Sequence, residues 1–233
     1  MPAVELSSLP VETHTDKGER ARTRLLSEAA RIFSEKGYAK ASTREICAAA
    51  GLNVAAIHYH FGGKDGLYRA VLQGPIHAIS TQLEGFDDPG LSLPQALARM
   101  LGAFAGLAAD DATTNLAADP HGLRLHLREL VEPSPVYAAA VAQHFVPHQQ
   151  AMARLLARHI GLAVPDDDVH RLVFALVAMA HDYCMSREFM KILAPGLLDR
   201  PDALNLALAR LVDWGVALVA HERTRRNTQL TPI

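Results

Sequence analysis

The chain has 233 residues, of which 49% are hydrophobic and 21% are charged, and this composition excludes a disordered, collagen-like or low-complexity protein. Two distant cysteines, Cys47 and Cys184, exclude a disulfide framework and a CxxC metal or redox pair, and no signal peptide or membrane span is predicted, so we expect a soluble cytoplasmic protein. The net charge of −2 argues at first against a nucleic-acid partner, but residues 15–73 hold ten basic and six acidic side chains, a balance of +4, and leave an acidic remainder.

The first two predicted helices have clear start and stop signals. Residues 16–36 place apolar side chains on one helical face, and Gly37 follows a lysine in the last turn, as at a glycine-terminated helix. Ser42 and Glu45 match a capping box for a short helix over residues 43–50, in which the Glu45 carboxylate reaches back to the Ser42 N–H.

The next two predicted helices complete an N-terminal module. Asn53 is expected to cap a third helix over residues 54–61, and a fourth begins at Lys64 and should kink or break at Pro75. The second and third helices are short, are joined by a three-residue turn with glycine and follow a longer packing helix. This is the pattern of a helix-turn-helix, whose second helix lies in the major groove of DNA, although other helical proteins contain similar pairs.

The remainder of the chain is predicted to be helical, without a convincing strand. Asp119 and Pro120 form a helix start, Pro147 should kink a long helix, and three carboxylates at residues 166–168 lie at a helix N-terminus, where the helix dipole favours them. The expected helices span about residues 92–110, 119–131, 135–160, 165–180 and 199–222.

Several sequence runs carry a family resemblance. The N-terminal runs are residues 41–46 (ASTREI), 50–61 (AGLNVAAIHYHF) and 63–69 (GKDGLYR). Together they resemble the DNA-binding domain of TetR-type repressors over about residues 17–72. The form AAIHYHFG, with Arg128-Glu129 and Pro133-Ser134-Pro135 downstream, is also similar to the CerR-type C-terminal subgroup.

The resemblance implies an all-α transcriptional regulator with two domains. A three-helix helix-turn-helix DNA-binding domain would occupy residues 15–73, and a helical ligand-binding and dimerisation domain would occupy residues 74–224. The protein would bind a palindromic double-stranded operator as a homodimer and repress transcription, until an unknown small-molecule effector moved the fourth helix and weakened binding. The implied DNA-contacting residues are Thr43, Arg44, Asn53, Ala55, Ala56, His58, Tyr59, His60 and Lys64.

Two apolar C-terminal helices predict the dimer contact. A helix that is apolar on two sides has to be buried on two sides. Pairing with the same helices of a second copy would give a four-helix interface with two-fold symmetry, whereas an ordinary monomer core would fit the same periodicity. With the resemblance added, we favour a homodimer. Its expected interface residues are Val169, Leu172, Val173, Leu176, Leu204, Leu208, Leu211 and Leu218.

Candidate ligand-binding residues lie in the same C-terminal part, although each apolar one is also a candidate for plain core. Arg128 could bind an anionic effector, but an internal ion pair with Glu129 is the favoured interpretation. Twelve histidines raise the question of a metal site, yet the sequence favours scattered histidines, so that no metal or cofactor is expected. The candidate effector-binding residues are Met100, Phe104, His126, Arg128, Phe145, Phe174 and His181.

Enzyme motifs are absent from the sequence, which contains no GxSxG, GxxxxGK[ST], GxGxxG or HExxH run. We therefore expect a regulator and not an enzyme. The alternative is a helical ligand-binding or enzymatic body whose N-terminal module only packs or docks against another protein.

Overall fold

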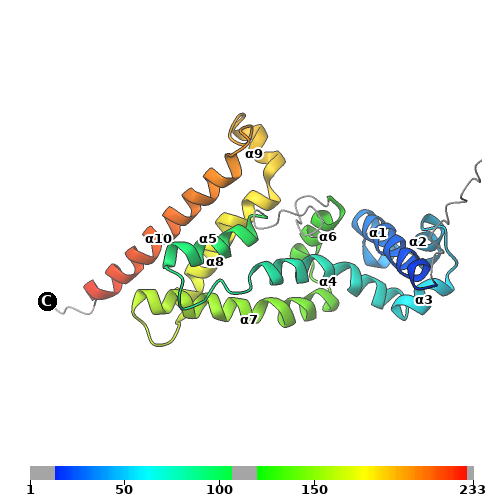
Figure 1. Ribbon diagram of the computed structural model, residues 1–233, viewed down its shortest axis with the longest axis horizontal. Helices are drawn as coiled ribbons and strands as arrows, with labels where there is room; N and C mark the ends of the chain where they lie inside the picture. The colour runs from blue at the N-terminus through cyan, green and yellow to red at the C-terminus, as the bar shows by residue number, and fades with distance from the viewer. Residues whose placement is uncertain (1–13, 107–119, 230–233) are drawn as a thin grey trace, which may run out of the picture. The chain divides into compact units, whose positions relative to one another are not determined.

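The structure is a computed structural model that describes residues 14–106 and 120–229 (Figure 1). Within these two ranges the chain forms ten α-helices and no strand, which confirms the expected all-α class. It divides into two compact units, the first ending at Val71 and the second beginning at Leu72. The predicted helix start at Asp119, and the predicted helical residues 107–110, lie outside the described residues.

The first unit holds the three helices that were predicted first. α1 spans His14–Lys40, α2 spans Thr43–Ala49 and α3 spans Ala55–Phe61. The regular geometry of α1 breaks at Gly37, which has a φ of 73°, so this glycine ends the straight part of the helix as the sequence indicated. α4, Lys64–Gln82, begins in this unit and continues past residue 75, so the interruption considered at Pro75 does not occur.

The core of the first unit combines aliphatic and aromatic side chains. Leu25 and Ile32 of α1 are buried with Ile46 of α2. Phe33 lies edge-on against Tyr68 of α4, with 4.8 Å between the ring centroids. Since helices this short are marginal alone, α2 and α3 depend on this shared core for their stability.

The second unit contains six more helices. α5 spans Leu93–Phe104, α6 Pro120–Val131, α7 Pro135–Ile160, α8 Asp167–Met185, α9 Arg187–Leu193 and α10 Ala203–Gln229. α7 continues through Pro147 as one helix, and the short helix α9 was not predicted. The expected helices of the body are otherwise present in the described ranges.

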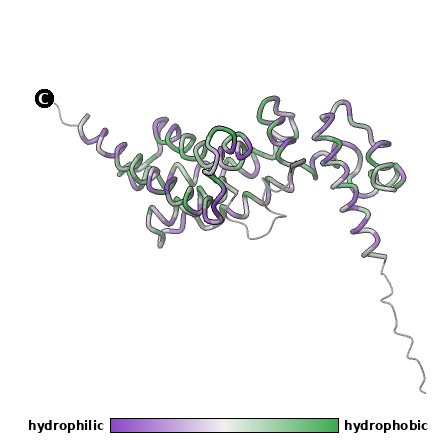
Figure 2. Tube along the Cα trace, turned by 90° about the horizontal axis from the view of Figure 1, so that it is seen from above, coloured by the Kyte–Doolittle hydropathy of each residue, from purple (hydrophilic) through white to green (hydrophobic). Residues whose placement is uncertain are grey.

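The core of the second unit forms where α10 packs on α5, α7 and α8 (Figure 1). Leu97 and Met100 of α5, Leu176 of α8 and Leu211 of α10 are almost completely buried there. A Cβ atom at Gly215 of α10 would lie 3.0 Å from Leu97 Cδ1, so the missing side chain allows α10 to approach α5 closely. In Figure 2 the apolar stretch of α10 gives way to hydrophilic residues towards its C-terminal end.

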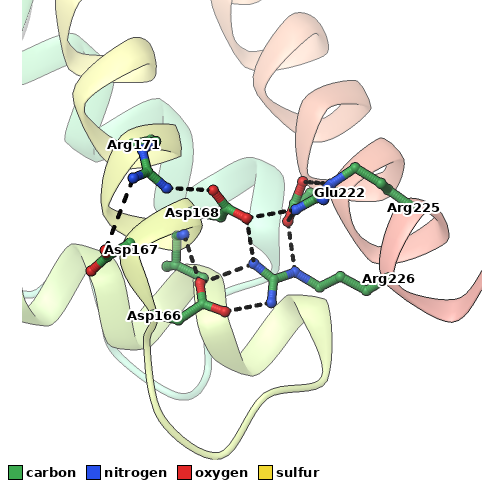
Figure 3. Close-up of polar contacts among 8 residues, drawn as sticks. Asp166, Asp167, Asp168, Arg171, Glu222, Arg225 and Arg226 are labelled. Carbon is green, nitrogen blue, oxygen red and sulfur yellow. Dashed lines mark hydrogen bonds and ion pairs between the residues drawn. The ribbon is translucent and has the colours of Figure 1, made fainter. Parts of the chain in front are cut away.

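That hydrophilic end is joined to the start of α8 by ion pairs (Figure 3). Arg226 binds the Asp166 carboxylate through two nitrogens, at 2.6 and 2.9 Å, and its Nε binds Glu222 at 2.6 Å. Arg225 binds Asp168 at 2.8 Å. Asp166 also accepts the N–H of Val169 at 3.1 Å, so it caps α8 and anchors α10 at once.

These contacts make the second unit sensitive to acid. The hydrogen bonds from Arg226, and then that from the Val169 N–H, lower the pKa of Asp166 well below its usual value. A carboxylate with a lowered pKa in the folded state stabilises the fold above its unfolded pKa and loses this contribution as pH falls. Asp166→Asn retains a capping side chain but loses the charge. We expect it to lower the free energy of unfolding by about 0.5–1 kcal/mol near pH 7, because the pair is partly exposed.

Urea denaturation followed by circular dichroism, repeated at several pH values, measures this effect. The difference from the wild-type protein should shrink below about pH 4, where the carboxylate of the unfolded chain becomes protonated. Asp167→Asn is the matched control, because the Asp167 side chain is 91% exposed. A difference that does not change with pH would contradict the role given to the Asp166 charge.

Candidate nucleic-acid interface and ligand cavity

Local hydrogen bonds fix the position and length of α3. The N-cap position of α3 is Val54, one residue later than predicted, but the Asn53 Oδ1 atom accepts the N–H of Ala56 at 3.2 Å, the bond that a capping side chain makes. Gly62, with a φ of 73°, ends the helix, and its N–H donates to the carbonyl oxygen of His58 at 3.0 Å. Ile57 is fully buried and anchors the inner side of the helix. A two-turn helix thus has one side in the core and the other available for contacts.

The remaining side chains of α3 are available at the surface. Tyr59 is 85% exposed, which is unusual for a large aromatic side chain in a folded domain. Ala55 and His58 are also exposed, whereas Ala56 and His60 are half-buried. His60 lies edge-on to the Tyr59 ring, with 4.8 Å between their centroids. Small, aromatic and hydrogen-bonding side chains are the types that contact bases and phosphates in a DNA groove.

α2 presents two more of the expected DNA-contacting residues in its first turn. Ser42 accepts the N–H of Glu45 at 3.1 Å, which confirms the first half of the capping box. The Glu45 carboxylate contacts the Lys36 ammonium of α1 rather than reaching back as the sequence indicated. Thr43 is half-buried and Arg44 is exposed, so the Arg44 guanidinium is available for an external partner.

Tyr38 holds the first turn of α4 and was missed by sequence reasoning. Its ring centroid lies 4.4 Å from the Lys64 Nζ atom, a cation–π contact, and its hydroxyl donates to Asp65. Tyr38 in turn packs on Tyr68, at 4.9 Å between ring centroids. An aromatic residue directly after the helix-ending Gly37 was the available signal. With Lys64 half-buried, all nine expected DNA-contacting residues retain exposed surface, and none is buried in the core.

The second unit contains a partly open cavity of about 270 Å³. Its apolar walls include Phe104 of α5 and Phe145 of α7, whose ring centroids are 6.4 Å apart. One end is polar and is formed by His126 of α6, Tyr137 of α7 and His181 of α8. Four of the seven residues expected to bind an effector therefore lie together: Phe104, His126, Phe145 and His181.

Burial sets the protonation of the polar end. Desolvation, and then the neighbouring His181, lower the pKa of His126 to about 4. Burial also lowers the pKa of His181, although the charge of Asp182 opposes the shift. Burial and the charge of Glu129 raise the pKa of Tyr137 to about 12. At neutral pH the polar end of the cavity is consequently uncharged.

Two family models cover most of the described chain. A model for bacterial regulatory proteins of the tetR family matches residues 25–71, and a model for the C-terminal domain of the HTH-type transcriptional dual regulator CecR matches residues 93–214, more than half of the chain. The chain belongs to the TetR family. Its C-terminal part is a CecR-type domain, to which the CerR-type resemblance of the sequence corresponds.

Known proteins agree with this assignment. The dual regulator CecR of Shigella flexneri is 29% identical over 185 residues, which cover 75% of this chain and 80% of the relative. UidR of Escherichia coli K12 is 34% identical over 56 residues, which are 24% of this chain and 29% of that protein. As members of this family are transcriptional regulators, the protein is a DNA-binding regulator and not an enzyme.

Solved structures share the fold. A tetR-family regulator from Streptomyces coelicolor matches with a TM-score of 0.56 and 21% identity, over 89% of this chain and 83% of that one. A tetR-family protein from Rhodococcus RHA1 matches with a TM-score of 0.60 and 21% identity, over 85% and 96% of the two chains. An N-terminal helix-turn-helix followed by a helical body is therefore the fold of this TetR-family chain.

Three of the expected effector-binding residues lie outside the cavity. Met100 is fully buried in the core, whereas Phe174 is 64% exposed and Arg128 is also exposed. The favoured ion pair of Arg128 with Glu129 stays a prediction. Glu129 is buried and accepts the N–H of Ser134 at 2.7 Å, so that it fixes the turn before α7. Neighbouring positions on a helix face different sides, which explains why one side chain is buried and the other exposed.

The expected dimer residues also need correction. Four of the eight, Val169, Val173, Leu176 and Leu211, are at most 1% exposed, because they form the core where α8 and α10 pack within the chain. Leu172, Leu204 and Leu208 are half-buried, and Leu218 is 37% exposed. The same helices leave other apolar side chains at the surface, namely Phe174, Leu206 and Trp214.

The length and apolar composition of α10 bear on the predicted absence of a membrane span. Residues 203–228 are long and apolar enough to cross a membrane by length and composition alone, although the sequence indicated no span. The core helix of a soluble protein passes the same test, and α10 packs on three helices of its own unit. Only 22% of the most apolar 18-residue stretch of α10 is buried among the described residues, which leaves much apolar surface uncovered.

The described residues contain no group of three or more His, Cys, Asp or Glu side chains that could hold a metal ion.

The Asn53 cap provides a test of how α3 is positioned. Asn53→Ala removes the side-chain oxygen that accepts the Ala56 N–H, and we expect a loss of about 1 kcal/mol in the free energy of unfolding. Asn53→Asp is the matched control and should remain close to the wild-type value, because a carboxylate caps a helix equally well. Urea denaturation of both variants measures the effect. Equal losses in the two variants would show that the capping bond is not the cause.

Proposed function

We propose that the protein is a ligand-responsive repressor that binds a palindromic operator as a homodimer. The observation that carries the proposal is the cavity of about 270 Å³ in the second unit of a chain whose first unit is a TetR-type DNA-binding module. A regulator that responds to a small molecule needs a site whose occupation favours one of two states. The proposed place of action is the cytoplasm, where bacterial DNA lies.

The proposed DNA contacts follow from the chemistry of the first unit. Arg44 would read a base, since a guanidinium pairs in a bidentate manner with guanine. Thr43, Tyr59 and Lys64 would bind phosphates, Lys64 with help from the free N–H groups at the start of α4. Asn53, Ala55, Ala56, His58 and His60 would approach base edges. The exposure of Tyr59 supports this assignment, because a bound DNA backbone would cover a ring that the chain leaves open.

The proposed dimer uses the outward sides of α8 and α10 instead of the inward sides expected from the sequence. Phe174, Trp214 and Leu218 are 64%, 50% and 37% exposed, and we call these three residues the dimer face. A second copy that covers the dimer face would bury large apolar side chains and, by two-fold symmetry, present two recognition helices to a palindrome.

The proposed response to the effector passes through α4. This helix carries Lys64 at its start and Ile79, which lines the cavity, near its end. A ligand that displaces Ile79 would shift α4 and with it the phosphate-binding first turn, which lowers operator affinity. CecR is named a dual regulator, and repression is the simplest output for this chain because a bound dimer blocks access to the DNA it covers.

Two substitutions separate base reading from phosphate binding. Once an operator has been selected from random DNA, Arg44→Ala should cost about 1–3 kcal/mol and relax the preference at one base pair. Lys64→Ala should weaken binding about equally for all operator variants and lower the salt dependence by about one phosphate contact. Lys191→Ala, in the second unit, is the control and should leave affinity unchanged.

Gel shifts on a panel of operator variants at several salt concentrations measure these effects. Absence of any sequence preference in the wild-type protein would refute the regulator proposal, and equal behaviour of the two variants would refute their separate roles.

Charge placed on the dimer face should separate the two copies. Phe174→Arg puts a cation where the proposed partner covers an apolar ring, so we expect monomers in sedimentation velocity and greatly reduced operator affinity. Val164→Arg is the control, because Val164 is 73% exposed but lies before α8, outside the dimer face. A wild-type monomer, or a Phe174→Arg variant that remains dimeric, would contradict the proposed interface.

A further inference from the structure

The walls of the cavity define the body of its ligand. Apolar side chains come from five helices, with Ile79 on α4, Phe104 on α5, Leu130 on α6, Val141 and Phe145 on α7, and Val177 on α8. At about 270 Å³, the cavity is smaller than the ~300–1,000 Å³ usual for drug-sized ligands. It therefore suits a compact apolar body of one or two rings rather than a long chain or a sugar.

The hydrogen-bond partners of the two ring nitrogens decide which tautomer His126 adopts. The Tyr137 hydroxyl and the His126 Nδ1 atom are 2.9 Å apart, and His126 Nε2 is buried without a partner among the described residues. If the hydroxyl donates to Nδ1, only the Nε2–H lacks a partner. If Nδ1–H donated instead, the phenol hydrogen and the Nε2 lone pair would both lack one. Because each buried unsatisfied group is costly, the Tyr137 hydroxyl donates and His126 carries its proton on Nε2.

The second imidazole is also available to a ligand. His181 lines the cavity and packs edge-on against His126, with 5.5 Å between ring centroids. It makes no hydrogen bond with any residue that the structure describes. The cavity thus ends in a pair of imidazoles that have unused hydrogen-bonding capacity beside an otherwise apolar wall. Buried polar groups of this kind are normally satisfied by water or by a ligand.

The charges around the polar end exclude ionic ligands. Glu129 acts on Tyr137 from α6, and Asp182 acts on His181 from α8, so a carboxylate ligand would meet two anions. Among the residues that the structure describes, the cavity lining includes no lysine or arginine to offset these anions and no carboxylate to pair with a cation. Removing an unpaired ion from water is expensive, which leaves an uncharged ligand as the one the site favours.

We infer that the cavity binds an uncharged, compact, mainly aromatic molecule that carries one hydroxyl or carbonyl group against the His126–His181 pair. The inference rests on the proposed function, in which this cavity holds the effector. The polar group bonds to His181 and supplies the acceptor that the His126 Nε2–H lacks. The apolar body fills the space between Phe104, Phe145 and Val177.

Three probes with the same two-ring body test the inference on the full-length protein without DNA. They are 2-naphthol, 2-methylnaphthalene, in which a methyl group replaces the hydroxyl, and 2-naphthoate. Isothermal titration calorimetry should show that 2-naphthol binds about tenfold more tightly than 2-methylnaphthalene, the value of one buried hydrogen bond, and more tightly than 2-naphthoate. Equal binding of the first two, tighter binding of 2-naphthoate, or no detectable binding of 2-naphthol would overturn the inference.

Histidine variants locate the hydrogen bond. His181→Phe should reduce the ratio of the 2-naphthol and 2-methylnaphthalene affinities to about one, because the polar partner is lost and the apolar wall remains. His159→Phe is the matched control, because it removes another imidazole with a buried, unpartnered Nε2, outside the cavity lining. A preserved ratio in a folded His181→Phe variant would overturn the inference. If that variant does not fold, the three probes on the wild-type protein decide by themselves.

The pH dependence separates the uncharged ligand from an anionic one. His181 acts on His126, Asp182 acts on His181, and Glu129 acts on Tyr137, the hydrogen-bonding partner of His126. Burial keeps both imidazoles neutral at neutral pH. Affinity for 2-naphthol should therefore stay constant between pH 8 and about pH 7 and fall only in acid, as the imidazoles gain protons. Affinity for 2-naphthol that rises steadily as pH falls would show that the protonated imidazoles bind the polar group better than the neutral ones, and would overturn the inference. Gel shifts with the operator test the effector role separately. If 2-naphthol binds through His181 but does not release the DNA, the inference about the ligand holds and the proposed effector role of the cavity is refuted.

Discussion

The packing of α10 on α5, α7 and α8 is the contact on which the second unit depends. Gly215 lets α10 approach α5 closely, and Leu211 and Leu176 fill the contact between α10 and α8. The ion pairs of Arg225 and Arg226 then fix the C-terminal end of α10 to the start of α8. While one side of α10 is held in this way, Leu206, Trp214 and Leu218 on this helix stay 37–50% exposed among the described residues. A single helix therefore supplies both the core of the body and the apolar surface that a second copy would cover.

Local signals made the first unit largely predictable. The Asn53 and Ser42 caps and the breaks at Gly37 and Gly62 each depend on residues within a few positions, so the sequence reveals them directly. The Glu45 carboxylate shows the limit of this approach. A lysine nine positions earlier, on another helix, binds it in place of the capping partner. Tyr38 was missed for the same reason, because its contacts with the first turn of α4 arise only in the folded unit.

The faces of the body helices could not be assigned from periodicity. α8 is apolar on two sides, and a helical repeat identifies an apolar stripe without indicating whether the chain itself or a partner covers it. Val173 and Phe174 are neighbours in sequence, yet the first is fully buried and the second is 64% exposed. Which side of α8 is buried depends on where α5 and α10 pack against it, and this depends on the tertiary structure. Four of the eight residues expected at the interface are for this reason core residues of α8 and α10.

The cavity residues also could not be assigned from periodicity, because only the fold brings them together. Phe104, His126, Phe145 and His181 come from four helices, and none of them belongs to a local motif that distinguishes a cavity wall from ordinary core. The number of histidines raises the question of a metal site, although the sequence favours scattered histidines. In the folded chain, His126 lies against His181 and Tyr137 in a desolvated pocket, which has a different consequence. Burial keeps the imidazoles uncharged, so they act as hydrogen-bonding groups in an apolar wall. A site that takes an uncharged molecule in the second unit lets the acidic charge of the body remain at its surface, while the basic first unit is free to bind phosphates.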